Sequence, residues 1–186
     1  MGKNQQKLQL EEALKDLQSG NTVKISAAIK KIEHIGDASA LPQLVELLRT
    51  AEQSTSKQVL DLLADMQDQN ACEILISLIQ NEKDDAVRQQ VLSTIWNSKL
   101  DYSDYLAEFV SLATEGDLLQ ALDCLTIIEN LSGPFEEHQL LEAQLYLKEY
   151  LESTAPKEER KNAIISDIAY FIKEQNEGID ADLLLD

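Results

Sequence analysis

Aromatic residues, glycine, proline and cysteine are all scarce in this chain of 186 residues, which has 5% aromatics, six glycines, three prolines and two cysteines. The two cysteines, Cys72 and Cys124, lie far apart in apolar segments, which favours a reduced cytoplasmic protein over a disulfide-stapled secreted one. No run of 18 apolar residues occurs, and residues 1–7 lack the apolar segment of a signal peptide. We therefore expect neither secretion nor a membrane span.

Positive charge is scarce as well, because 16 Lys and Arg residues face 34 Asp and Glu residues, a formal net charge of −18. Such a chain repels phosphate backbones, so nucleic acid is not an expected partner. The imbalance is strongest over residues 100–156, where Lys148 is the single basic residue against twelve acidic ones. Two interpretations remain open: a solvated face that maintains solubility, or a field that steers a basic partner segment.

Motifs that carry chemistry are missing from the sequence. The two histidines, His34 and His138, have no Cys or His at the spacing of a zinc site. There is no glycine-rich phosphate loop, nucleophile elbow or His-Glu-x-x-His helix. Acidic pairs such as Asp84-Asp85 fall at predicted helix starts, where they complement the helix dipole. We predict no catalytic residue, no metal and no cofactor.

The feature that is abundant is helical periodicity, since apolar residues recur at spacings of three and four without sustained alternation. Gly20-Asn21 and Gly36 mark helix ends. Short links between the helices predict antiparallel hairpins. The predicted helices span about residues 4–18, 23–35, 37–48, 56–66, 69–80, 85–97, 103–114, 118–131, 135–152 and 157–175.

The helices repeat along the chain. A shift of 31 residues places Ile29 on Leu60 and Leu47 on Leu78, and a further shift of 34 places Leu78 on Leu112. Such repeats cannot bury their apolar stripes alone, so they stack and share one continuous core. We therefore expect Leu60 and Leu78 to be core residues.

The residues of the first repeat resemble a known pattern. Val23-Lys24 with small residues after it, the turn Ile35-Gly36-Asp37 and a helix that begins Leu41-Pro42 are similar to the bacterial HEAT-like repeat, and Asp85-Ala86-Val87-Arg88 resembles the start of another. The resemblance is close over 22–50, looser over 55–80 and 84–114, and weak after 117. It implies an all-α fold, a right-handed α-solenoid of about four antiparallel helical hairpins, with capping helices at both ends.

In that family the usual role is binding other proteins, so the resemblance implies a non-catalytic protein-binding or scaffold module in a bacterial-type cytoplasm. The alternatives are an enzyme on this fold, such as a bilin lyase, and a structural subunit of a larger complex. We predict one HEAT-like domain over residues 1–177 and an acidic, apolar tail over residues 178–186. The tail is a frayed terminus, a lid over the last helix or a docking motif. Neither the partner's identity nor the oligomeric state follows from these patterns.

The resemblance also implies that the second helix of each repeat lines a concave surface, where Glu46, Ser77 and Ser111 occupy equivalent outward positions. An aromatic ring among carboxylates holds Lys or Arg side chains, and tyrosine is common in binding hot spots. A solvated helix face explains the same residues. The predicted partner-binding residues are Glu46, Ser77, Glu108, Ser111, Glu142, Tyr146, Glu149 and Tyr150.

Four of these residues share the predicted helix 135–152. Spacings of three and four place Glu142, Tyr146, Glu149 and Tyr150 on one ridge. We expect the leucines of this helix to fill the core and leave both tyrosines free for a partner. The leucines concerned are Leu140, Leu141, Leu145, Leu147 and Leu151. Among the other aromatics, we expect Trp96 and Phe109 in the core.

Overall fold

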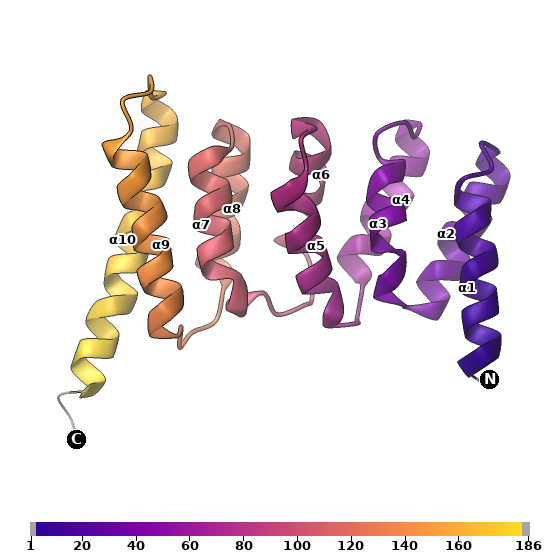
Figure 1. Ribbon diagram of the computed structural model, residues 1–186, viewed down its shortest axis with the longest axis horizontal. Coiled ribbons are helices and arrows are strands. Elements are labelled where there is room, and N and C mark those ends of the chain that lie inside the picture. The colour runs from indigo at the N-terminus through magenta and orange to yellow at the C-terminus, as the bar shows by residue number, and fades with distance from the viewer. Residues whose placement is uncertain (1–2, 184–186) are drawn as a thin grey trace. The chain divides into compact units, whose positions relative to one another are not determined.

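The computed structural model describes the backbone of residues 3–183 and the side chains of residues 4–176. This part of the chain contains ten α-helices, two 3₁₀ turns and no β-strand (Figure 1). The all-helical prediction is therefore confirmed. The elements are α1 (Lys3–Leu17), α2 (Thr22–Ile35), η1 (Ala38–Ala40), α3 (Leu41–Leu47), α4 (Gln53–Asp65), α5 (Asn70–Asn81), α6 (Asp85–Ile95), η2 (Ser103–Tyr105), α7 (Leu106–Glu115), α8 (Leu118–Asn130), α9 (Glu137–Glu152) and α10 (Glu159–Leu183).

The chain divides into two compact units, Met1–Leu100 and Asp101–Asp186. In the first unit, α1, α3 and α5 form one layer and α2, α4 and α6 form the other (Figure 1). Each helix packs on the next helix of its own layer, and α1–α2, α3–α4 and α5–α6 pack between the layers. Stacked helical hairpins in two layers are the architecture of an α-solenoid.

The second unit repeats this arrangement with four helices. Helix α7 packs on α8 and α9, and α10 packs on both α8 and α9. The layers are thus α7 with α9 and α8 with α10. The boundary between the units falls in the link between α6 and α7, inside the third predicted hairpin.

Local capping explains where several helices begin and end. The Asn21 side chain accepts hydrogen bonds from the N–H groups of Val23 and Lys24, and so caps α2 as its sequence position predicts. Gly36 ends the same helix with a left-handed backbone (φ of 69°), a conformation that favours glycine. Asp84 caps α6 in the same way as Asn21 caps α2.

The structure differs from the predicted boundaries at three helices. The predicted helices 37–48 and 103–114 each begin with a 3₁₀ turn, and Asp37 caps the first of these turns through the N–H of Ser39. Helix α10 continues to Leu183 instead of ending at 175, so residues 178–183 of the predicted tail have helical backbone. Residues 184–186 of that tail lie outside the described residues. The single domain and the separate tail stay predictions.

The core of each unit consists of aliphatic side chains from facing helices. Ile32, Leu63 and Leu75 are fully buried in the first unit, and Phe109 and Ile168 are fully buried in the second. Both cysteines are buried. In the described part of the chain, no helix is long and apolar enough to span a membrane.

Three residues expected in the core are not there. Leu60 and Leu78 are only half-buried, because Leu60 faces a polar groove that includes Gln90, and Leu78 faces a surface hollow described below. Trp96 is 45% exposed, because α6 ends at Ile95 and the ring lies beyond the helix's buried stripe. These predictions are wrong, whereas the buried position of Phe109 is confirmed.

Candidate interaction site

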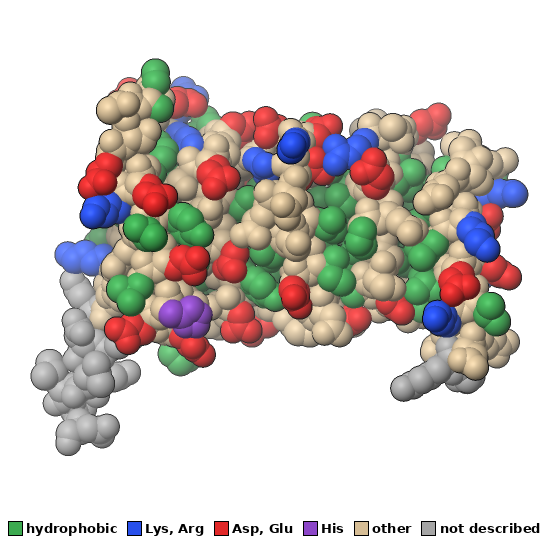
Figure 2. Space-filling model, in the orientation of Figure 1, with side chains coloured by type: hydrophobic (Ala, Val, Ile, Leu, Met, Phe, Trp, Pro, Cys, Tyr) green, Lys and Arg blue, Asp and Glu red, His purple; other side chains and the backbone are tan. Residues whose placement is uncertain are grey.

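Polar side chains of α7 and α9 gather on one surface of the second unit, which we term the acidic face. Along α7 they recur at spacings of three and four, and along α9 at spacings of four, so each set lies on one side of its helix. Figure 2 shows acidic side chains spread over these two helices. The acidic face comprises Glu108, Ser111, Glu115, His138, Glu142 and Tyr146.

Glu108 is the half-buried carboxylate of this face. Burial raises its pKa above the ordinary value, and the negative charge of Glu142 on the neighbouring helix adds to the rise, while His138 opposes it. A raised pKa means that the ionised form of Glu108 is held at a cost in free energy. A cation placed between Glu108 and Glu142 would remove part of that cost.

Tyr146 contacts Glu142 one turn earlier on the same helix, within this face. Its hydroxyl donates a hydrogen bond of 3.2 Å to Glu142 Oε1. Burial raises the pKa of Tyr146, and the hydrogen bond with Glu142 and the charges of Glu142, Glu108 and Glu115 raise it further. On α7, Ser111 Oγ donates to Glu115 Oε1 at 3.1 Å. The structure therefore brings together Glu108, Ser111, Glu142 and Tyr146, four of the predicted residues.

Two leucines on α9 extend the acidic face with apolar surface. Leu141 and Leu145 are 56% and 52% exposed, and Leu151, nearer the end of the helix, is also exposed. The prediction that these three leucines fill the core is wrong, because the buried stripe of α9 is made by Leu140, Leu147 and small or polar residues between them. Leu141 and Leu145 lie one turn apart, and Leu145 lies one turn from Glu149.

Tyr150 makes its contacts within the second unit, so the prediction that it is free for a partner is wrong. Its hydroxyl donates to Asn162 Oδ1 at 2.7 Å, and the Nζ atoms of Lys157 and Lys161 each lie 5.2 Å from the centre of its ring. Burial raises the pKa of Tyr150. Lys161 Nζ also donates to the carbonyl groups of Thr114 and Gly116. Tyr150 and Lys161 thus tie α9 and α10 to the end of α7.

The remaining predicted residues lie apart from this cluster. Glu149 is exposed on α9. Glu46 and Ser77 belong to the first unit, on α3 and α5 respectively, and both are exposed. The Ser77 carbonyl accepts a hydrogen bond from Asn81 Nδ2 at 2.7 Å. Glu46 is part of a charged network at the turns of the first unit.

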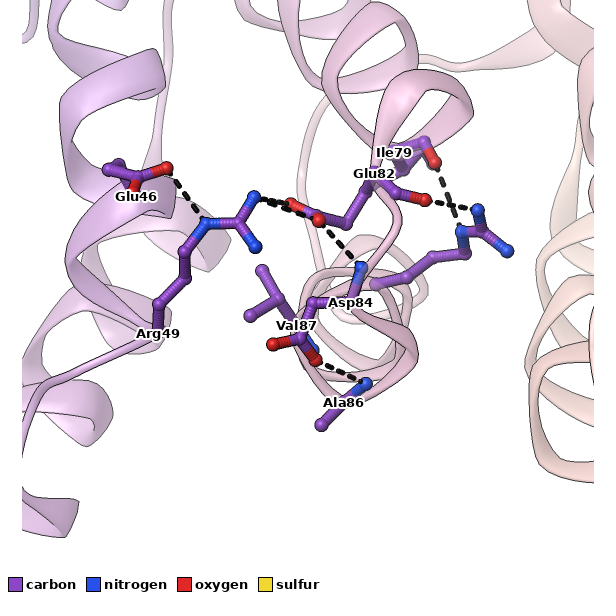
Figure 3. Close-up of polar contacts among 8 residues, drawn as sticks. Glu46, Arg49, Ile79, Glu82, Asp84, Ala86 and Val87 are labelled. Carbon is purple, nitrogen blue, oxygen red and sulfur yellow. Dashed lines mark hydrogen bonds and ion pairs between the residues drawn. The ribbon is translucent and has the colours of Figure 1, made fainter.

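Arg49 is the centre of that network (Figure 3). Its Nε donates to Glu46 Oε2 at 2.8 Å, and one terminal nitrogen donates to both Glu82 oxygens at 2.8 and 2.7 Å. Arg49 follows α3 and Glu82 follows α5, so the contact links two successive repeats. Glu46 and Glu82 both raise the pKa of Arg49. Arg49 is therefore a fixed cation of the structure.

Glu82 is a buried carboxylate that the network satisfies. Its Oε1 accepts from the backbone N–H of Asp84 at 2.8 Å, and its carbonyl oxygen accepts from Arg88. Burial acts to raise the pKa of Glu82, but the hydrogen bonds from Asp84 and Arg49 and the charge of Arg49 outweigh it and hold the pKa below 4.5. Arg88 also donates to the Ile79 carbonyl, which fixes the start of α6 against the end of α5.

The two-layered stack of hairpins and its repeat-to-repeat contacts agree with a comparison of sequence families. The family model for HEAT repeats matches residues 9–96. The match covers most of the first unit, which therefore carries HEAT-like repeats. HEAT repeats typically serve as protein-interaction scaffolds, so the geometry of surfaces and turns bears on function. No curated protein and no solved structure matches the chain.

Sequence reasoning missed the exposed leucines and the partners of Tyr150. Leu141 and Leu145 are ordinary core residues by type, and only the position of α9 against its neighbours shows which side of the helix is buried. Nothing in the link between α9 and α10 indicates from the sequence that Lys157 lies over the Tyr150 ring. In the described residues, no group of three or more His, Cys, Asp or Glu side chains is placed to hold a metal ion.

Proposed function

We propose that this protein is a non-catalytic, cytoplasmic binding scaffold whose acidic face holds a basic, amphipathic segment of a partner protein. The observation that carries the proposal is the pair Glu108 and Glu142, whose repulsion a cation would relieve. The HEAT-like repeats of the first unit, which typically serve as interaction scaffolds, support a protein as the partner.

The apolar surface next to this pair defines the second part of the proposal. Leu141 and Leu145 are exposed beside carboxylates, so a segment that carries apolar residues on one side and Lys or Arg on the other matches both features. Burial of the leucines supplies affinity, and the carboxylates supply orientation and a faster encounter. Ser111 and Tyr146 complete the face as hydrogen-bonding groups.

The test uses a synthetic helical peptide with leucines at spacings of three and four and lysines on the adjacent side. We expect Glu108→Gln/Glu142→Gln to weaken binding by about tenfold at low salt, because two paired carboxylates are removed from the contact. Leu141→Ala/Leu145→Ala should weaken it by a similar factor. Calorimetric titration measures both.

A matched control removes the same charge elsewhere in the second unit. Glu129→Gln/Glu174→Gln changes exposed carboxylates of α8 and α10, which form the other layer. This control should bind within about twofold of the unmodified protein, since its carboxylates act only at long range. Equal weakening in the control and in Glu108→Gln/Glu142→Gln would contradict the proposal and leave the acidic residues as a solubility feature.

A further inference from the structure

A hollow of about 780 Å³ opens in the first unit, at the edge where the turns between helices lie. It lies between the α1–α2 turn and the α3–α4 turn, and one stripe of α3 faces it. Its size is in the range of pockets that hold compact ligands or a few residues of a peptide. The residues that the argument uses are Leu17, Gln18, Gln43, Glu46, Leu47, Glu52 and Leu78, all of which line the hollow.

We call the space between two successive turns of this edge an interval. The next interval, between the α3–α4 turn and the α5–α6 turn, is bridged by Arg49. Arg49 follows the end of α3 and reaches the Glu82 carboxylate (Figure 3). In the sequence, Arg49 lies three residues before Glu52, the residue that precedes α4. Gln18 is the corresponding residue of the first interval, since it lies three residues before Asn21, the cap of α2. The hollow thus has the neutral, shorter side chain of Gln18 at the position where the next interval has the guanidinium of Arg49.

The hollow is lined by hydrogen-bond acceptors and carries negative charge. Its charged groups are Glu52 and Glu46, of which Glu46 already accepts from Arg49 through Oε2, and the described residues that line the hollow include no Lys or Arg. Gln43 Oε1 is buried and has no hydrogen-bond partner within the described part of the chain. A buried acceptor without a donor is uncommon and costs stability.

The geometry points to a binding site for an arginine side chain on a short, partly apolar segment of a partner protein. The aliphatic part of the arginine packs on Leu17, Leu47 and Leu78, as long basic side chains do on apolar surface. The guanidinium, with five N–H donors in one plane, donates to the Glu52 carboxylate, to the second oxygen of Glu46 and to Gln43 Oε1, where an ammonium group fits less well. This site uses a different unit and different residues from the acidic face, so either proposal stands without the other.

The test titrates the ¹⁵N-labelled full chain with the peptide acetyl-Leu-Arg-Leu-amide and with the same peptide in which citrulline replaces arginine. Citrulline has nearly the same shape as arginine without its charge, so the pair isolates the guanidinium. We expect saturable NMR shifts at residues that line the hollow and an affinity at least about fivefold higher for the arginine peptide. Titration in the Glu108→Gln/Glu142→Gln background removes competition from the acidic face.

Variants of the hollow complete the experiment. Glu52→Gln should weaken the arginine peptide about threefold to tenfold and leave the citrulline peptide unchanged, and Glu52 makes no capping hydrogen bond that the change would remove. Gln43→Leu should also weaken the arginine peptide, while the fold is retained. Glu33→Gln, an exposed carboxylate of α2 outside the hollow, is the matched control and should bind as the unmodified protein does. Equal affinity for the two peptides, shifts away from the hollow, or no saturable binding would each overturn the inference.

Discussion

At the scale of single residues, Glu82 shows how a buried charge is supported in this protein. The carboxylate is removed from water, yet three hydrogen bonds from Arg49 and Asp84 keep it ionised. A buried charge without such partners would be strongly destabilising. The contact also joins two repeats, so its protonation state bears on the stability of the first unit.

The lowered pKa of Glu82 predicts how stability depends on pH. Because the pKa is lower in the folded state than its ordinary value of 4.5, the ionised carboxylate stabilises the fold above pH 4.5, and this contribution is lost as the pH falls through the folded pKa. Glu82→Gln should therefore be less stable than the unmodified protein at pH 7, and the gap should close toward pH 3. Urea unfolding followed by circular dichroism at several pH values measures the gap.

The control for this prediction is Glu11→Gln, which removes an exposed carboxylate of α1. It should follow the unmodified protein closely at each pH. A gap between Glu82→Gln and the unmodified protein that stays constant from pH 7 to pH 3 would show that the Glu82 charge does not contribute to stability.

Residue positions were predictable where they depend on nearby sequence. Asn21, Gly36 and Asp84 act on backbone groups two to four residues away, so their types reveal their roles. Leu78 and Trp96 were wrongly placed because burial depends on what a neighbouring helix presents. The prediction that Tyr150 is free for a partner fails for a similar reason, since the lysines over its ring come from a separate segment.

At the scale of elements, the ten helices follow from the sequence because the helical spacing of apolar residues and the positions of glycine, proline and capping residues agree along the chain. The helix starts were predicted within about three residues, which is the reliability expected of boundaries. The 3₁₀ turns before α3 and α7 escaped prediction because their residues differ little from those of a first α-helical turn. The acidic face was found in part, since spacing along α9 identified Glu142 and Tyr146 together.

Helix α5 offers a matched test of which leucines stabilise the stack. Leu75 is 1% exposed, whereas Leu78 on the same helix faces the hollow. Leu75→Ala should lower the free energy of unfolding by roughly 2–5 kcal/mol, because it leaves a cavity between repeats. Leu78→Ala should cost only about 1 kcal/mol, because little buried area is lost. Chemical denaturation measures both, and equal losses would contradict the assignment of the core.

At the scale of the whole molecule, the two units differ more in charge than in architecture, since both are stacks of helical hairpins. Residues 1–60 carry eight basic and seven acidic residues, whereas residues 100–156 carry one and twelve. Like charges at this density repel one another and oppose the compact state. The acidic composition of the second unit therefore has a cost in stability, which a binding role for its acidic face would explain.

That cost predicts a response to salt. The Debye length falls from about 10 Å at 0.1 M to about 3 Å at 1 M salt, so sodium chloride should screen the repulsion and raise the melting temperature of the unmodified protein. Glu129→Gln/Glu149→Gln, which removes two exposed carboxylates near helix C-termini, should melt higher at low salt and gain less from added salt. Thermal unfolding at several sodium chloride concentrations measures both effects. A melting temperature that falls or stays constant with salt would mean that the carboxylates are already compensated within the fold, and the acidic face would then have little unbalanced charge with which to attract a basic partner.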